Sequence, residues 1–215
     1  HQSLPPHSYL YGLPYALYRE NKVRRYGFHG TSHHYVGKAA ARFLQRPFSE
    51  LRLVTLHLGN GASAAAISQG SCRETSMGMT PLEGLVMGTR SGDLDPAILF
   101  YLARETGMSL NELDQMLNKE SGLKGICGDN DMRTITGRIR EGDRQAELAL
   151  DIFCHRLKKY IGAYLAVLGG ADGLVFTGGI GEHSAEVRHR ACLGLEGLGI
   201  QLDPEKNTLP SSGTR

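Results

Sequence analysis

Three glycine-rich segments contain the residues of this chain that are best suited to chemistry. They are HLGNG at His57–Gly61, MGTRSGD at Met87–Asp93 and FTGGIGE at Phe176–Glu182. The first and third follow apolar runs typical of strands, Leu51–Leu58 and Leu174–Phe176, and glycine there lets backbone N–H groups approach an anionic ligand closely. One glycine cluster after a strand is usually a tight turn. Three of them, each with a polar or charged side chain, predict one nucleotide site assembled from separate loops.

Two well-known phosphate-binding motifs are not supported by the residues. The chain has no glycine-led loop that ends in Gly-Lys followed by Ser or Thr, as a P-loop requires. A dinucleotide fingerprint is poorly supported, because Gly181 is followed by Glu182, His183 and Ser184, so the third glycine is missing. What remains is a phosphate-handling site of backbone loops, an arginine and histidines. Phosphoryl transfer suits such a site, since it depends mainly on positioning and charge neutralisation.

Composition narrows the class of protein. The 215 residues, 40% of them hydrophobic, favour one domain with a full core. The net charge is only +2 and the basic residues are dispersed, which gives little support to a nucleic-acid or membrane partner. The four cysteines have no paired spacing, as expected for reduced thiols that fill the core of a cytoplasmic protein. The start, HQSLPPHSYLYG, has neither Met nor a signal pattern, so we expect a piece of a longer protein.

The elements that must position the three segments are predicted from periodicity and capping signals. Strands and helices alternate, as α/β architecture requires. The first residues, to about Asn21, are rich in Pro and Tyr and are expected to form an extended arm that packs through its aromatic side chains. Gln69-Gly70 is expected to turn a hairpin, and Ser109 to Glu112 form a capping box. We expect strands at Leu51–Leu58, Ala62–Ile67, Ser71–Thr75 and Gly173–Thr177, a further glycine-broken strand near the C-terminus, and helices at Thr31–Phe43, Asp95–Glu105, Ser109–Leu117, Arg144–Leu168 and Ser184–Leu195.

Five ordered motifs carry a family resemblance that covers essentially the whole chain. RRYGFHGTSHHYV at Arg24–Val36, HLGNGAS at His57–Ser63, ETSMGMTPLEGLVMGTRSGDLDPAI at Glu74–Ile98, NKESGLKGI at Asn118–Ile126 and FTGGIGE resemble the acetate kinase family, which includes propionate and butyrate kinases. The resemblance implies an α/β domain of the acetate and sugar kinase, Hsp70 and actin superfamily, ribonuclease H-like, with a mixed sheet and flanking helices. It also implies reversible transfer of the ATP γ-phosphate to a short-chain carboxylate, acetate first and propionate second, giving an acyl phosphate and ADP with Mg²⁺.

The resemblance implies two catalytic residues. His29 matches the family's histidine that stabilises the transferring phosphoryl group, and Arg90 matches its arginine that acts on the transition state. A guanidinium fork suits two phosphoryl or carboxylate oxygens. A lone arginine usually forms a salt bridge, but Arg90 lies between Gly88 and Gly92 in a loop expected to be too flexible for a scaffold, which favours function.

The histidines near His29 allow a second interpretation. His33 follows at i+4, a spacing that could indicate zinc on a helix. A zinc protease would need Glu after the first histidine, and Gly30 stands there, so we predict no metal site in this chain. His33 and His34 are expected to be structural or surface residues.

The resemblance also implies three groups of nucleotide-binding residues: a loop around the β- and γ-phosphates, a triplet that contacts adenosine, in which the arginine could cover one face of the base, and a second nucleotide turn. His183 departs from the family pattern, in which Asn is usual. The residues are His57, Leu58, Gly59, Asn60 and Gly61 in the loop, Asp131, Met132 and Arg133 in the triplet, and Gly179, Ile180, Gly181, Glu182 and His183 in the turn.

Several residues that the family uses are not found in this sequence. They are an upstream Asn for Mg²⁺, an Arg for the substrate carboxylate, an essential Asp, and a glutamate that belongs after Arg215. We therefore expect residues 1–215 to be the C-terminal domain of a cytoplasmic, homodimeric kinase, with residues 1–21 joining the N-terminal domain, the Mg²⁺ ligands elsewhere, and no activity alone. A non-catalytic nucleotide-binding module of the same superfamily stays open, although His29 and Arg90 argue against it.

Overall fold

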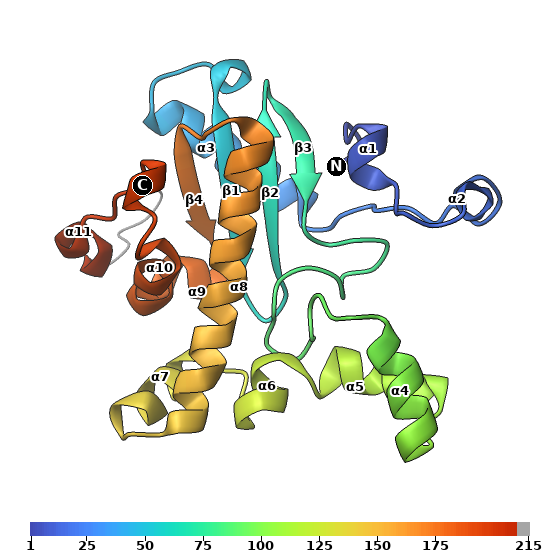
Figure 1. The fold of residues 1–215 in the computed structure, drawn as a ribbon. Coiled ribbons are helices and arrows are strands. Elements are labelled where there is room, and N and C mark those ends of the chain that lie inside the picture. The colour runs from blue at the N-terminus through green and yellow to red at the C-terminus, as the bar shows by residue number, and fades with distance from the viewer. Residues whose placement is uncertain (210–215) are drawn as a thin grey trace.

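A mixed four-stranded sheet forms the centre of the molecule (Figure 1), in a computed structural model that describes residues 1–209. The strand order is β3-β2-β1-β4. β1 (Arg52–Leu58) pairs antiparallel with β2 (Ala62–Ser68), β2 pairs antiparallel with β3 (Ser71–Thr75), and β1 pairs parallel with β4 (Gly173–Thr177). The predicted α/β class, with a mixed sheet and flanking helices, is confirmed.

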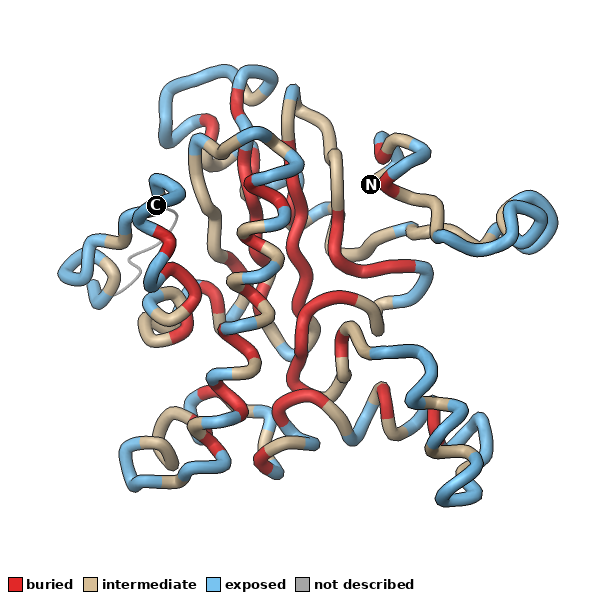
Figure 2. Tube along the Cα trace, in the orientation of Figure 1, coloured by how far each residue is buried: buried red, intermediate tan, exposed pale blue. Residues whose placement is uncertain are grey.

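Helices cover the two faces of the sheet. The long helix α8 (Arg144–Leu168) packs on β1, β2 and β3, and α3 (Gly30–Phe43) packs on β1 and β4 from the other side. Successive strand residues point to opposite faces, so Val54, Leu56 and Leu58 join the large core beneath α8 while Leu53 joins a small cluster beneath α3. The two central strands, β1 and β2, are therefore almost wholly buried, whereas the edge strands β3 and β4 are mostly half-buried (Figure 2).

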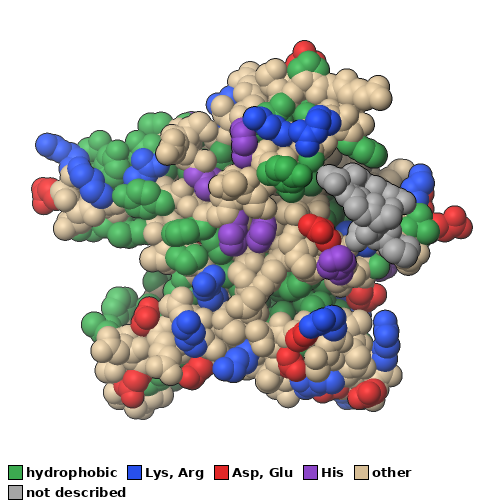
Figure 3. All heavy atoms as spheres, turned by 180° about the vertical axis from the view of Figure 1, so that it is seen from behind, with side chains coloured by type: hydrophobic (Ala, Val, Ile, Leu, Met, Phe, Trp, Pro, Cys, Tyr) green, Lys and Arg blue, Asp and Glu red, His purple; other side chains and the backbone are tan. Residues whose placement is uncertain are grey.

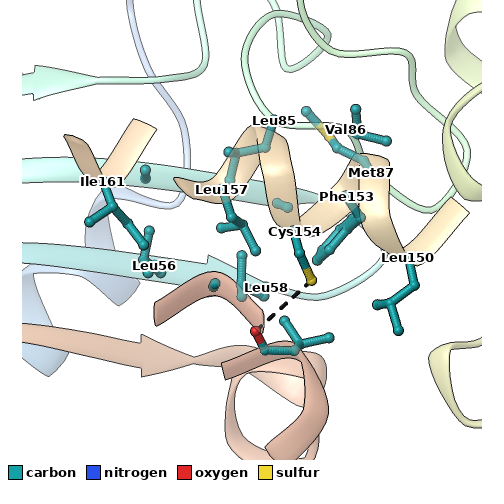
Figure 4. Packing of buried hydrophobic residues seen from close by; sticks show 14 of the residues in the cluster. Leu56, Leu58, Leu85, Val86, Met87, Leu150, Phe153, Cys154, Leu157 and Ile161 are labelled. Carbon is teal, nitrogen blue, oxygen red and sulfur yellow. Dashed lines mark hydrogen bonds between the residues drawn. The ribbon is translucent and has the colours of Figure 1, made fainter. Parts of the chain in front are cut away.

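The large core is built mainly from α8. Its residues Leu150, Phe153, Leu157 and Ile161 lie over Leu56 and Leu58, and the Leu85–Met87 segment closes one side (Figure 4). Cys154 also lies in this core, and its thiol donates to the Val187 carbonyl oxygen at 4.0 Å. All four cysteines have free thiols, three of them buried and Cys72 half-buried, as expected for core fillers.

Most of the longer predicted elements are confirmed. α3, α8, the four strands, α4 (Ala97–Thr106), α5 (Leu110–Lys119) and α10 (Ala185–Cys192) all form within a few residues of their predicted bounds. Gln69 and Gly70 turn the β2–β3 hairpin with φ of 53° and 70°. Ser109 and Glu112 form the expected capping box at the start of α5.

Several short helices replace predicted loops, and two predictions are wrong. The N-terminal arm is not simply extended, because it contains α1 (Pro6–Tyr9) and α2 (Tyr15–Asn21), each preceded by a proline. The glycine-broken strand is absent from residues 193–209, which hold η2 (Glu196–Leu198) and α11 (Pro204–Thr208). Helices of three to nine residues are marginal in isolation and depend on capping and packing. The others are η1 (Phe48–Glu50), α6 (Gly122–Cys127), α7 (Met132–Arg140) and α9 (Gly178–His183).

The arm packs through its aromatic side chains. The rings of Tyr9 and Tyr18 lie 5.7 Å apart, and the Arg24 guanidinium lies 3.7 Å from the centre of the Tyr9 ring. α1 packs beside β3, whereas α2 projects away from the sheet on that side (Figure 1). None of the helices formed by residues 1–209 is long and apolar enough to cross a membrane.

Candidate functional site

Parallel strands bring two of the glycine-rich segments to one edge of the sheet. β1 and β4 run in the same direction, with His57 opposite Thr177, so the loop after β1 and the helix α9 after β4 are neighbours. Gly178 has a φ of +78°, and a Cβ there would lie 2.6 Å from the Leu58 carbonyl oxygen. This close approach explains why glycine begins the GGIGE segment, which forms α9 and not the predicted turn.

The MGTRSGD segment, the second of the three along the chain, is hydrogen bonded to the first. The Gly88 N–H donates to the Asn60 carbonyl oxygen at 3.0 Å, and a Cβ on Gly88 would lie 2.1 Å from Asn60 Oδ1. On the other side, the carbonyl oxygens of Met87 and Gly88 accept from the Leu123 and Lys124 N–H groups of α6, both at 2.9 Å. All three glycine-rich segments therefore meet at this end of the sheet.

The loop that carries Arg90 is held in place and is not the flexible loop that its glycines were expected to make. The Ser91 N–H donates to the Leu117 carbonyl oxygen at 3.1 Å. The Asp93 carboxylate accepts from the Gly84 N–H at 2.8 Å and from the Tyr160 hydroxyl at 2.7 Å. A Cβ on Gly92, whose φ is +67°, would lie 2.3 Å from a backbone oxygen. The glycine permits close packing, so the prediction of a flexible loop is wrong.

Arg90 and His29 converge on Gly61. A Cβ built on Gly61 would lie 3.3 Å from Arg90 Nη1, 3.6 Å from His29 Cε1 and 3.7 Å from His29 Nε2. Within residues 1–209 Arg90 forms no salt bridge, and the one side-chain contact of its guanidinium is a weak one to Met87 Sδ at 3.8 Å. A half-buried guanidinium without a carboxylate is available to an anionic ligand.

His29 is held in a defined orientation. It precedes α3 with a left-handed φ of 59°, a strained backbone position for a residue other than glycine. Its Nδ1 hydrogen bonds to Ser63 Oγ at 2.9 Å, and its ring stacks on His57 at 4.2 Å. Burial, with further contributions from the charges of His57 and Arg90, lowers the pKa of His29 to about 4. The imidazole is therefore neutral near pH 7.

The other three histidines of the region differ in environment. His57 Nδ1 hydrogen bonds to Ser32 Oγ at 2.8 Å, and burial lowers the pKa of His57. His33 is buried, while His34 is exposed beside Phe48. Several histidine side chains gather in the middle of the rear face, with Lys and Arg side chains below them (Figure 3). In the described part of the chain, no three His, Cys, Asp or Glu side chains lie close enough to hold a metal ion.

A cleft of about 1080 Å³ opens beside the Gly59–Asn60 backbone. Eight of the thirteen residues predicted to bind nucleotide line it, and they come from the β1–β2 loop, the start of α7 and α9. They are Gly59, Asn60, Asp131, Met132, Arg133, Gly179, Ile180 and His183.

Five predicted nucleotide-binding residues do not line this cleft. Leu58 and Gly181 are buried behind it. The Glu182 carboxylate accepts from the Thr177 hydroxyl at 3.0 Å. His57 and Gly61 lie instead beside His29. Of the thirteen predicted residues, the structure thus places eight in the cleft, two beside His29, and three in packing or hydrogen-bonding positions outside both.

The adenosine triplet has a structural role as well as its position in the cleft. Asp131 caps α7 by accepting from the Arg133 N–H at 2.9 Å, and its carboxylate pairs with the Arg133 guanidinium at 2.6 Å. The hydrogen bonds from Arg133 lower the pKa of Asp131 to about 2. The Arg133 side chain is 92% exposed at the cleft rim, and Met132 is buried in the core.

Sequence reasoning missed the cleft residues that lie outside its motifs. Asn130 precedes the triplet, and its side-chain amide donates to Asn60 Oδ1 at 2.9 Å. Met132, Thr136 and Ile139 lie on one face of α7 at helical spacing, a signal that was missed because no helix was predicted there. The lining residues not foreseen are Asn130, Thr136, Ile139, Arg140, Leu150, Ser184, Ala185, Glu186 and Arg190.

Comparison with known proteins agrees with the geometry. The model of the acetokinase family matches residues 1–215. The acetate kinase of Syntrophobacter fumaroxidans is 61% identical over 99% of this chain and 52% of its own length. That of Leifsonia xyli is 58% identical over 100% of this chain and 54% of its own length. The chain thus spans about half the length of the curated relatives it matches.

Two solved structures have the same fold. The crystal structure of Porphyromonas gingivalis acetate kinase superposes with a TM-score of 0.94 at 46% identity, covering 96% of this chain and 52% of that one. A propionate kinase from Francisella tularensis superposes with a TM-score of 0.93, also at 46% identity, over 96% and 53% of the two chains.

Proposed function

The chain belongs to the acetate kinase family, and on this premise we propose that it is the C-terminal, nucleotide-binding domain of a kinase that transfers the ATP γ-phosphate reversibly to a short-chain carboxylate. The observation that carries the proposal is the convergence of Arg90 and His29 on Gly61, next to the large cleft. The products are an acyl phosphate and ADP. Acetate is the proposed substrate and propionate the alternative, since the relatives at 54–61% identity are acetate kinases.

The proposed mechanism assigns separate tasks to the cleft and to its neighbouring side chains. The cleft takes the nucleoside of ATP, and the Gly59–Gly61 backbone directs the phosphates toward Arg90. Phosphoryl transfer passes through a loose transition state with charge spread over three equatorial oxygens. The Arg90 fork donates to two of these oxygens, and neutral His29 donates from Nε2. Both groups are fixed before the reaction, so stabilising the developing charge requires little reorganisation.

Among residues 1–209 no cluster of three His, Cys, Asp or Glu side chains offers a ligand set for magnesium, which the family uses. The carboxylates that line the cleft, Asp131 and Glu186, are already paired with Arg133 and Arg190. When bound, Mg²⁺ neutralises charge on the β- and γ-phosphates. We expect its protein ligands, and the group that holds the substrate carboxylate, to come from the other half of the kinase.

The proposal includes the assembly and the compartment. Four unpaired thiols support a reducing cytoplasm. An exposed apolar surface on α4, made of Ile98, Phe100 and Tyr101, supports a homodimer. We propose that residues 1–21 connect this domain to the N-terminal domain. A pure nucleotide-binding module is less well supported, because it would have no use for an unpaired arginine and a neutral histidine facing the same point.

Acetyl phosphate formation, trapped with hydroxylamine, tests the proposal. We expect no turnover from the 215-residue chain with ATP, Mg²⁺ and acetate, and turnover once the N-terminal half of the protein is supplied. The matched control is the same complementation with Arg90→Ala, whose turnover should be lower by roughly two to four orders of magnitude. Robust turnover by the chain alone would contradict the division of the site, and failure of the complete protein with both acetate and propionate would contradict the kinase assignment.

A further inference from the structure

A row of hydrogen bonds runs behind His29 into the protein interior. His29 Nδ1 contacts Ser63 Oγ at 2.9 Å, Ser63 Oγ contacts His33 Nε2 at 2.8 Å, and His33 Nδ1 contacts Thr55 Oγ1 at 2.7 Å. Ser63 and Thr55 are fully buried and His33 is 2% exposed. The function proposed above uses only the outer end of this row, at His29.

The fold explains why these four side chains meet. Alternation along the strands places Thr55 of β1 on the α3 face, opposite to the apolar Val54 and Leu56. Ser63 of β2 pairs with His57 and lies on the same face. His33 follows His29 by one helical turn, so both imidazoles reach the same hydroxyl. Sequence reasoning expected His33 to be structural or on the surface, and the structure shows it buried between two hydroxyls.

The number of protons limits what this row can do. Burial lowers the pKa of His33 to about 3 and that of His29 to about 4, so both imidazoles are neutral near pH 7 and carry one N–H each. With one O–H each from Ser63 and Thr55, four protons serve three hydrogen bonds. One proton therefore lies outside these three bonds. It is not that of Ser63, because within residues 1–209 the buried Ser63 hydroxyl has hydrogen-bond partners only in the two imidazoles, and an O–H pointing elsewhere would be unsatisfied. The proton points outward either from Thr55 Oγ1 or from His29 Nε2.

The two ends of the row offer different acceptors. At the inner end the Thr55 hydroxyl has the Ala65 carbonyl oxygen at 3.5 Å, at the limit of a hydrogen bond. At the outer end His29 Nε2 faces the space beside Gly61 that Arg90 also faces. A phosphoryl group held there by Arg90 presents charged oxygens, which are much stronger acceptors than a distant carbonyl. The outward proton therefore belongs on His29 Nε2 when the phosphates are bound.

We propose that Ser63, His33 and Thr55 are positioning residues that hold neutral His29 in the tautomer with its proton on Nε2, so that it donates to the transferring phosphoryl group. The proposal rests on the proposed function, because it deepens the role given to His29. In this tautomer Thr55 donates to His33 Nδ1, His33 Nε2–H donates to Ser63, and Ser63 donates to His29 Nδ1. The direction of each hydrogen bond depends on the direction of the one before it. Loss of any one bond therefore leaves the tautomer of His29 unfixed.

The first test removes the central hydroxyl with Ser63→Ala in the complete kinase. Because His29 then lacks its fixed donor, kcat should fall roughly 10- to 100-fold while the KM for ATP stays within about threefold. The matched control is Ser76→Ala, which also removes a fully buried serine hydroxyl, one that accepts from the Ala64 N–H and lies outside the row. Its kcat should stay within roughly twofold of wild type.

The second readout does not depend on activity. Nitrogen-15 NMR of labelled histidine distinguishes the two neutral tautomers directly, because protonated and unprotonated ring nitrogens have different shifts. With a non-hydrolysable ATP analogue bound, His29 should carry its proton on Nε2 in wild type and in Ser76→Ala. Ser63→Ala should give a mixture of the two tautomers.

Three further variants keep the proposal falsifiable if Ser63→Ala folds poorly. His33→Gln keeps an N–H donor toward Ser63 and should retain the Nε2–H tautomer, whereas Thr55→Val should weaken it and Thr55→Ser should not. A wild-type His29 protonated on Nδ1, or a Ser63→Ala protein with wild-type kcat and tautomer, would overturn the relay. If instead His29→Ala has a normal kcat, the role of His29 in the proposed function fails, whatever the tautomer.

Discussion

The two faces of the sheet use the same strands for different purposes. Toward α8, β1 presents Val54, Leu56 and Leu58, and they pack into one continuous apolar core. Toward α3, the alternate residues Thr55 and His57 are polar and hydrogen bond to residues of α3. Neighbouring residues of β1 therefore point to different faces of the sheet. The α8 face carries the apolar core that stabilises the fold, and the α3 face carries the polar side chains of the proposed site.

This difference explains where the chain tolerates polar groups in its interior. Burying a polar group without a partner costs roughly 1–3 kcal/mol, so every buried polar side chain on the α3 face needs a partner. Thr55, His33 and Ser63 satisfy one another. On the α8 face Tyr164 is the exception, because its buried hydroxyl has no partner in the described part of the chain. The comparison predicts that substitutions on the α3 face mainly alter catalysis and that substitutions on the α8 face mainly alter the stability of the fold.

The largest expected effect is on the chemical side, at Arg90. In the complete kinase, Arg90→Ala should lower kcat by roughly two to four orders of magnitude, on the order of 3–5 kcal/mol of transition-state stabilisation, with a much smaller change in apparent ATP affinity. Arg90→Lys should recover only part of the loss, since it lacks the planar fork. Steady-state kinetics measure this. A mutant with near-normal kcat and weak ATP binding would reassign Arg90 to ground-state binding.

The matching change on the stabilising face is Phe153→Ala. Phe153 is 1% exposed in the core beneath α8, so its truncation should lower the free energy of unfolding by about 3–5 kcal/mol. Urea unfolding followed by circular dichroism measures the loss. The exposed Leu148→Ala on the same helix is the control, and its effect should be small because Leu148 is 53% exposed. Equal losses from both variants would show that the α8 face is not the main source of stability.

A somewhat smaller catalytic effect is expected at His29. His29→Ala should lower kcat by roughly 10²- to 10³-fold, because one preorganised donor to the phosphoryl group is lost. His34→Ala, on the exposed side of α3, should be nearly silent. Elemental analysis of both proteins separates this role from zinc binding. Stoichiometric zinc that disappears with His29→Ala would refute the phosphoryl role.

The smallest effect concerns acid stability of the α3 face. The pKa of His33 is lowered from 6.5 to about 3 in the folded protein, so the unfolded chain binds a proton at a pH where the folded one does not. The contribution of neutral His33 to the free energy of unfolding is fully present above about pH 6.5 and is lost as the pH falls toward 3. Between pH 7 and pH 5 the free energy of unfolding should fall by about 2 kcal/mol for this reason. Unfolding free energies of wild type and His33→Gln at both pH values measure the difference. His34→Gln should leave the pH dependence unchanged, and a His33→Gln protein with the wild-type slope would contradict the assignment.

The sequence alone predicted the elements whose signals are local. The bounds of α8 and β4 agree with their predicted bounds, because the helical periodicity of α8 and the short apolar run of β4 are both signals between near neighbours in the sequence. The capping box of α5 and the Gln69-Gly70 turn are local in the same sense. The three glycine-rich segments were recognised as candidates for one site, and their meeting follows from the parallel pairing of β1 with β4 and the contact of Gly88 with Asn60.

Only the tertiary structure decided which face each polar residue occupies and what it contacts. His29 and Ser63 are 34 residues apart, and His33 and Thr55 are 22 apart, so no local pattern indicates that they share hydrogen bonds. No local pattern indicates the role of Gly92 either. The lack of a side chain at Gly92 allows its loop to pack closely against a distant backbone segment and does not serve to make the loop flexible. The short helices α6, α7 and α9 form because packing against α8 or β1 stabilises them, with an Asp131 cap on α7, which their own few residues cannot do. Local propensity is set by near neighbours along the chain, whereas burial, pKa and hydrogen-bond partners are set by neighbours in space.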